Sequence, residues 1–155
     1  MSNVLRIAIV DPNDSSRIAL KNILLGLDIV WLEAECSRYE FFSDVISQTK
    51  PDIGIVCIDS SPEKGLKLVE TLRDTSSDCA ILVVSSSNDG QVILRAVRAG
   101  AKEFLTSPVN VEDLVGAVDR IGQGTGIAAT APGVVGTNEL AGFTTLARLD
   151  LGGGE

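Results

Sequence analysis

The chain has 155 residues, with 13 Lys or Arg against 21 Asp or Glu, and its formal net charge is −8 at pH 7. A charge of this sign repels nucleic-acid phosphates and anionic lipids, so we expect no nucleic-acid partner. The sequence contains no histidine, which excludes Ser–His and Cys–His nucleophiles and most zinc sites. Hydrophobic residues make up 45% of the chain, enough to build a buried core.

The three cysteines, Cys36, Cys57 and Cys79, are widely spaced and form no CxxC pair. This pattern predicts buried thiols in a reducing compartment rather than a disulfide framework. The N-terminal sequence lacks a signal-peptide pattern, and no apolar run approaches the roughly 18 residues of a membrane helix. We therefore expect a cytoplasmic protein without membrane insertion.

Short apolar runs alternate with segments whose apolar residues recur at helical spacing. In chain order the predicted elements are a strand at 4–10, a helix capped by Asn13 or Asp14, a strand at 29–34, a helix opened by a capping box of Ser37 and Glu40, a strand at 53–58, a helix at about 64–74, a strand at 79–85, a helix opened by a capping box of Asn88 and Gln91, a strand at 103–106, and a last helix capped by Asn110. Five strands alternating with five helices predict an α/β fold, with a five-stranded parallel sheet covered by helices on both faces.

The composition changes after Ile121. Nine of the 15 glycines lie from Gly122 onward, and the chain ends in GGGE. This composition is typical of linkers. We predict one folded domain at 1–122, followed by a Gly-rich flexible linker or tail at 123–155.

Four polar residues lie at the carboxyl ends of predicted strands: Asp11, Asp59, Ser85 and Ser107. In a doubly wound parallel sheet, ligands bind outside the carboxyl ends of the strands. We therefore expect two carboxylates and two hydroxyls to converge at one edge of the sheet.

This order of residues, together with AVRAGAKEFLTSP before the last helix, resembles the receiver domain of response regulators, the CheY-like family, over residues 4 to about 121. The resemblance implies the flavodoxin-like strand order 2-1-3-4-5. In that family an acidic pair holds Mg²⁺, an Asp accepts a phosphoryl group, a Ser or Thr follows the phosphate, and a Lys before a Pro pairs with its charge. By resemblance, Asp59 is the candidate phosphoacceptor and Ser85 the phosphate-side hydroxyl. Phe104 is the switch aromatic, and Asp11 with Asp59 is a weak candidate metal site.

The chain departs from the family pattern at two positions. Pro12 stands where the second acid belongs, and Ser107 stands where the lysine belongs. Proline offers no carboxylate, and the loss of the lysine removes a charge that stabilises phosphoryl transfer. These departures indicate a degenerate receiver, or pseudo-receiver, with at most weakly bound Mg²⁺ and no other cofactor. We expect the Ser107–Pro108 bond to be cis, like the matching Lys–Pro bond of receivers.

The segment LRAVRAGAKEFLTSPVNVEDLVGAV is also similar to the N-terminal receiver-like domain of the CpaE/TadZ family of pilus-assembly proteins. This resemblance implies a non-enzymatic protein-interaction domain, acting in pilus assembly or localisation. Receivers pair through their fourth helix, fifth strand and fifth helix, so we expect a homodimer interface. Its candidate residues are Arg95, Arg98, Lys102, Phe104, Glu112 and Asp119.

Two other functions remain open. One is a phosphorylatable two-component response regulator that uses Asp59 with Mg²⁺. The other is a flavodoxin-like small-ligand binder, which the 4% aromatic content and the absence of a Gly-rich loop after the first strand disfavour.

Overall fold

The computed structural model describes residues 4–124. The chain divides between Val115 and Gly116 into two units, and the whole sheet lies in the first. The predicted tail at 123–155 lies almost entirely outside the described residues, so its flexibility stays a prediction.

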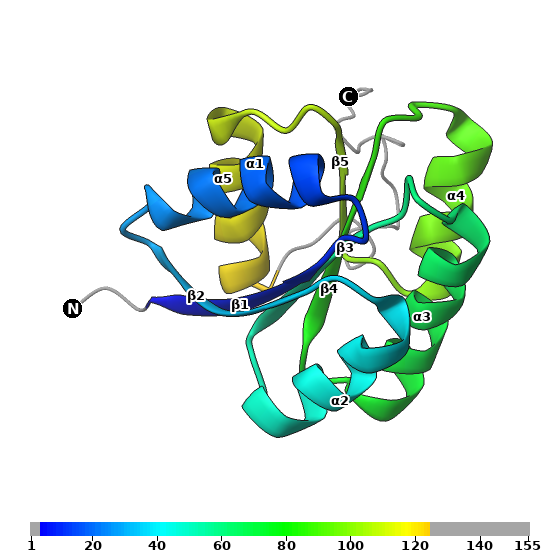
Figure 1. The fold of residues 1–155 in the computed structure, drawn as a ribbon, viewed down its shortest axis with the longest axis horizontal. Helices are drawn as coiled ribbons and strands as arrows, with labels where there is room; N and C mark the ends of the chain where they lie inside the picture. The colour runs from blue at the N-terminus through cyan, green and yellow to red at the C-terminus, as the bar shows by residue number, and fades with distance from the viewer. Residues whose placement is uncertain (1–3, 125–155) are drawn as a thin grey trace. The chain divides into compact units, whose positions relative to one another are not determined.

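Five parallel strands form one sheet, and they pair in the order β2-β1-β3-β4-β5 (Figure 1). The strands are β1 (Leu5–Val10), β2 (Val30–Cys36), β3 (Ile53–Cys57), β4 (Ala80–Ser85) and β5 (Glu103–Thr106). The central strand β3 is buried at every residue, as a parallel strand covered on both faces should be. The predicted fold class and strand order are confirmed.

The helices that connect the strands cover both faces of the sheet (Figure 1). They are α1 (Asp14–Leu25), α2 (Tyr39–Thr49), α3 (Pro62–Thr75) and α4 (Gly90–Ala99), and α5 (Val111–Gly122) follows β5 in the chain. Side chains of α2, α3 and α4 form one buried cluster with alternate residues of the strands, among them Ala8, Val10, Val56 and Val83. Helix α1 lies on the opposite face, where it buries Leu20 and Leu24.

The helix starts follow the predicted caps at α1 and α5 and depart from them at α2 and α4. Asn13 caps α1 by accepting from the Ser16 amide, and the Asn110 side chain accepts from the Asp113 amide at the start of α5. The capping box predicted at Ser37 is wrong, because the N-cap of α2 is Arg38, which makes no side-chain cap hydrogen bond. The cap predicted at Asn88 is also wrong. Asp89 caps α4 and accepts from the Gln91 amide.

No cap was predicted for α3. Ser61 is its N-cap, and Pro62 occupies the first turn, where a missing N–H leaves no hydrogen bond unmade. The helix begins two residues before the predicted Lys64 and ends one residue after the predicted Asp74.

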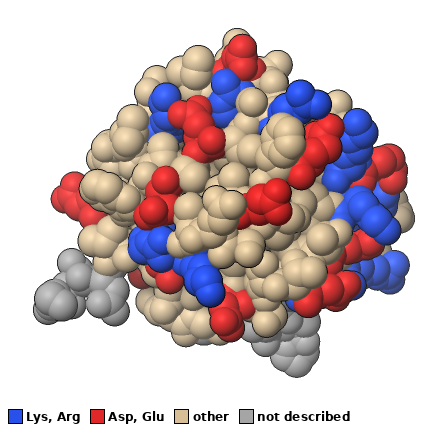
Figure 2. Space-filling model, turned by 60° about the horizontal axis from the view of Figure 1, so that its bottom comes forward, with Lys and Arg blue, Asp and Glu red and all other residues tan. Residues whose placement is uncertain are grey.

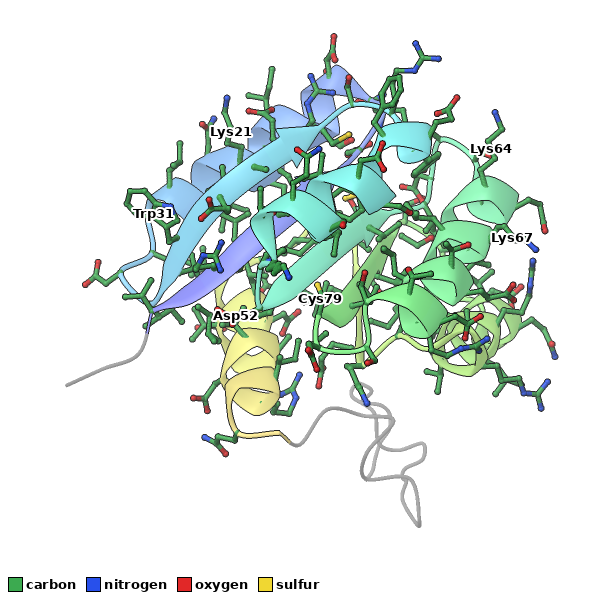
Figure 3. The ribbon with its side chains drawn as sticks, turned by 90° about the horizontal axis from the view of Figure 1, so that it is seen from below. Lys21, Trp31, Asp52, Lys64, Lys67 and Cys79 are labelled. Carbon is green, nitrogen blue, oxygen red and sulfur yellow. The ribbon has the colours of Figure 1, made fainter. Side chains whose placement is uncertain are left out.

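Acidic and basic side chains are interspersed over the face in Figure 2. Arg95 of α4 pairs with Glu63 of α3 at 2.9 Å. Trp31 lies on the edge strand β2 and is 62% exposed (Figure 3). Between residues 4 and 124, no helix is long and apolar enough to cross a membrane.

Gly65 allows α3 to approach the end of β3 closely. A Cβ at this position would lie 2.6 Å from Cγ2 and 2.9 Å from Cβ of Ile58, a fully buried residue. We predict that Gly65→Ala lowers the free energy of unfolding by about 1–3 kcal/mol, because the added carbon overpacks this contact. Urea denaturation measures the loss. The matched control is Gly90→Ala, whose Cβ would meet no described atom within 4 Å. An equal loss in both variants would contradict the packing argument.

Candidate functional site

The parallel strands bring the predicted polar residues to one edge of the sheet. Asp11 directly follows β1, Asp59 comes two residues after β3, Ser85 ends β4, and Ser107 directly follows β5. Asp59 and Ser85 are in direct contact, and the Ser107 amide donates to the Ser85 carbonyl at 2.8 Å. Asp11 lies near the same group, because its carboxylate and that of Asp59 both act on the Cys57 thiol.

The carboxylate of Asp59 is used to order the loop between β4 and α4. Its Oδ1 accepts from the Ser85 hydroxyl at 3.1 Å and from the Ser86 amide at 2.8 Å. The Ser87 amide in turn donates to Ser85 Oγ at 3.1 Å. A serine hydroxyl has one proton, and here it is committed to Asp59. Asp59 itself remains exposed, whereas Ser85 is buried.

Asp11 is only 2% exposed, and both of its carboxylate oxygens have donors from the chain. The Asn13 amide donates to Oδ1 at 3.0 Å, and the Ser16 hydroxyl donates to Oδ2. The Asp11 amide is fixed as well, because it donates to the Cys36 carbonyl at 3.0 Å. A buried charge needs such partners to offset its desolvation.

Arg17 anchors the loop between β1 and α1 to the neighbouring strand β2. Its guanidinium donates to the Asp11 carbonyl at 2.9 Å, to the Asp14 carboxylate at 2.8 Å and to the Glu35 carboxylate at 3.1 Å. The hydrogen bond to Asp14 is the main cause that raises the pKa of Arg17. Lys21 also donates to Glu35, at 3.0 Å, and this bond is the main cause that lowers the pKa of Glu35.

Two residues of the site were not predicted from the sequence. Burial raises the pKa of the Cys57 thiol well above its usual value, and the nearby carboxylates of Asp11 and Asp59 add to the effect. Tyr39 donates its hydroxyl to the Cys57 carbonyl at 2.6 Å, and burial raises its pKa to about 12. The Ser61 backbone acts on the same phenol in the opposite direction and lowers its pKa. Tyr39 therefore ties α2 to the end of β3, two residues before Asp59, and no sequence motif marks it.

The positions where the chain departs from the receiver pattern lie where the sequence placed them. Pro12 follows Asp11 in the loop, and Ser107 stands at the carboxyl end of β5. The Ser107–Pro108 bond is cis, which confirms the prediction. Lys102 precedes the first residue of β5 and so lies at the other end of that strand from Ser107. Phe104 is 7% exposed and belongs to the buried cluster.

The predicted interface residues differ in how much surface they offer. Arg95, Arg98, Lys102 and Glu112 are exposed, and Arg95 is paired with Glu63. Phe104 is buried and offers little surface to a partner. Asp119 is exposed and lies in the second unit, beyond Val115.

The residues at this edge do not fit a Mg²⁺ ion held by the acidic pair of the family pattern. Mg²⁺ requires oxygen ligands in near-octahedral geometry. Pro12 supplies none, and in the candidate pair Asp11 and Asp59, both oxygens of Asp11 and one oxygen of Asp59 already accept hydrogen bonds. Across residues 4–124, no three His, Cys, Asp or Glu side chains are grouped so that they could hold a metal ion.

The contacts of Asp59 predict different effects for two substitutions. Asp59→Asn keeps an oxygen acceptor for Ser85 and Ser86, whereas Asp59→Ala removes it. We expect Asp59→Ala to lower the free energy of unfolding by about 1 kcal/mol more than Asp59→Asn. Hydrogen exchange at the Ser86 amide should accelerate only in the Ala variant. Equal exchange in both variants would mean that Asp59 does not order this loop.

Tyr39 predicts a pH dependence of stability. The phenol ionises near pH 10 in the unfolded chain but at about 12 in the folded protein. Its contribution to stability is therefore complete below pH 10 and is lost as the pH rises toward 12. Denaturation below pH 10 and at about pH 11 measures this loss. Tyr39→Phe, which has no proton to lose, should show a smaller decline, and an identical decline would contradict the assignment.

Comparison with known proteins points to the receiver family that the sequence resembles. The family model described as the response regulator receiver domain matches residues 7–119. The chain is 28% identical over 111 residues to the DNA-binding transcriptional activator EvgA of Escherichia coli, covering 72% of this chain and 54% of EvgA. It is 24% identical over 118 residues to the chemotaxis protein CheY of Thermotoga maritima, covering 75% of this chain and 96% of CheY.

The chain thus spans about half the length of EvgA but nearly all of CheY. Among solved structures, the signal receiver domain of the putative response regulator NarL from Mycobacterium tuberculosis aligns with a TM-score of 0.72 at 18% identity. That alignment covers 79% of this chain and 98% of the NarL domain. With the family model matched over most of the chain and the strand order of the receiver fold in place, this chain belongs to the response regulator receiver domain family.

Proposed function

We propose that this receiver domain is a non-enzymatic, cytoplasmic protein-interaction module that works without efficient phosphorylation of Asp59. The observation that carries the proposal is the state of the two carboxylates. Both oxygens of Asp11 and one oxygen of Asp59 already accept hydrogen bonds from the chain itself. The site is therefore satisfied without a metal ion or a phosphoryl group.

The replacement of the family's lysine by Ser107 supports the proposal from the side of the chemistry. Phosphoryl transfer is accelerated mainly by positive charges that stabilise the oxygens of the transferred group. Ser107 has no charge. Lys102 cannot replace the lysine, because it lies at the other end of β5 from Ser107. Without that charge, we expect transfer to Asp59 to be slower by orders of magnitude.

The contacts of Ser85 and Phe104 support a surface that does not depend on phosphorylation. Ser85 already donates to Asp59, and Phe104 is already packed in the core. In the family these positions respond to the phosphoryl group. Here both side chains have partners without it, so a partner protein would meet the same surface in every condition.

A phosphorylatable response regulator remains the second candidate. Asp59 is exposed and stands beside a hydroxyl, so that a phosphodonor can reach it. The similarity to CheY covers nearly the whole of that protein. This function would require charge stabilisation from a group other than Ser107.

We place the module in pilus assembly or localisation, on the strength of the similarity between residues 94–118 and CpaE/TadZ proteins. Those residues form most of α4, all of β5 and most of α5. Genes for pilus secretion beside this one would support the assignment. A neighbouring histidine kinase gene would instead favour the second candidate.

A second copy of the chain is the partner that the exposed charges favour. Arg98, Lys102 and Glu112 offer both signs of charge, which suits a self-complementary contact. Sedimentation of the wild-type protein should detect dimers, and Arg98→Glu should lower their fraction. Lys67→Glu, at an exposed position of α3, is the control. A monomer at all concentrations would overturn this part of the proposal.

The experiment that tests the central proposal is incubation with acetyl phosphate and Mg²⁺, followed by intact-mass measurement. Wild-type protein should gain no more of the phosphoryl mass than Asp59→Asn, which cannot accept it. Pro12→Asp/Ser107→Lys restores the acid and the lysine of the family pattern and should gain it. A wild-type protein that is phosphorylated in large part would overturn the proposal in favour of the second candidate.

A further inference from the structure

The hydroxyl of Ser16 lies against the carboxylate that the family uses for its metal ion. Ser16 is the third residue of α1 and donates to Oδ2 of Asp11. Its amide donates to the side chain of the N-cap Asn13 at 3.0 Å. The first turn of α1 thus fixes the direction of this hydroxyl.

The Ser16 hydroxyl donates to the Asp11 carboxylate rather than to Asn13. The other oxygens near its Oγ are Oδ1 of Asn13 at 3.2 Å and the carbonyl oxygen of Asn13 at 3.4 Å, and both are weaker acceptors than a carboxylate. A bond to an ionised group is shorter and stronger than one between neutral groups. The Ser16 proton therefore goes to Asp11.

The rest of the loop keeps the carboxylate turned inward. The Asn13 amide donates to Oδ1 of Asp11, and the Arg17 guanidinium donates to the Asp11 carbonyl. Asp11 is 2% exposed as a result. A divalent cation would have to displace the Ser16 or the Asn13 hydrogen bond before it gained a ligand, and Pro12 offers it no second carboxylate.

We propose that Ser16 is a positioning residue that keeps Asp11 free of metal. The hydroxyl of Ser16 and the amide of Asn13 donate to the two Asp11 oxygens that a divalent cation would need. The loop between β1 and α1 is therefore held in place without a metal ion. The inference rests on the proposed function and deepens it, because it names the residue that makes the site independent of Mg²⁺.

Titration with Mg²⁺ alone, followed by NMR shifts of the Asn13 amide, tests the inference. We expect wild-type protein to bind in the millimolar range or more weakly. Ser16→Ala should bind roughly tenfold more tightly, since a hydrogen bond to a charged group corresponds to at least that factor in an equilibrium constant. Ser15→Ala, at the exposed neighbouring position, and Ser16→Thr, which keeps the hydroxyl, should titrate like wild type.

Two results would overturn the inference: equal affinities of Ser16→Ala and Ser16→Thr, or saturation of the wild-type protein at tens of micromolar Mg²⁺. The wild-type titration needs no substitution, so the test does not depend on the folding of a variant. Tight Mg²⁺ binding by a wild-type protein that still gains no mass from acetyl phosphate would refute the role of Ser16 and leave the proposed function standing. Phosphorylation of a wild-type protein that binds Mg²⁺ weakly would refute the proposed function and leave the role of Ser16 standing.

Discussion

A carboxylate enclosed at the end of a β-strand must find donors, and this requirement at Asp11 organises one side of the molecule. The loop after β1 turns back so that the Asn13 amide and the Ser16 hydroxyl reach it. The same turn sets the N-cap of α1 and places Arg17 between the loop and β2. The first helix, the edge strand and the acidic site are therefore parts of one hydrogen-bonded arrangement.

The second carboxylate satisfies the same requirement in a different setting. Asp59 is exposed and has water available, yet its Oδ1 still orders the loop between β4 and α4. Tyr39 holds the segment before Asp59 through the Cys57 carbonyl. Under the proposed function, the site that accepts a phosphoryl group in other receivers would serve here as a set of structural contacts. A partner protein would then meet one state of the surface around α4.

Much of the fold follows from the sequence pattern, because apolar runs and helical spacing report burial directly. The strand at 103–106 and the order of all five strands were predicted without error. The convergence of Asp59 and Ser85 was also predictable, since parallel strands end at one edge. The caps of α2 and α4 were each misplaced by one residue. Ser37 and Asn88 have the right chemistry, but the backbone makes its turn at Arg38 and Asp89.

The contacts that decide the state of the site could not be predicted. Ser16 is one serine of an SS pair, and only the turn at Asn13 selects it over Ser15. Tyr39 reaches the Cys57 carbonyl across 18 positions of sequence, a separation that no local pattern encodes. Both roles depend on where a single hydroxyl points in the folded chain.

The central claim is that the chain's own donors hold both carboxylates and that neither Mg²⁺ nor a phosphoryl group is needed. Hydrogen exchange at the amides of Asn13 and Ser86 reports these contacts most directly, because each donates to one of the carboxylates. It should be measured in wild-type protein alone and with Mg²⁺ and beryllofluoride together. We expect each amide to show the same protection with and without Mg²⁺ and beryllofluoride. A change in protection at both amides on adding Mg²⁺ and beryllofluoride would contradict it.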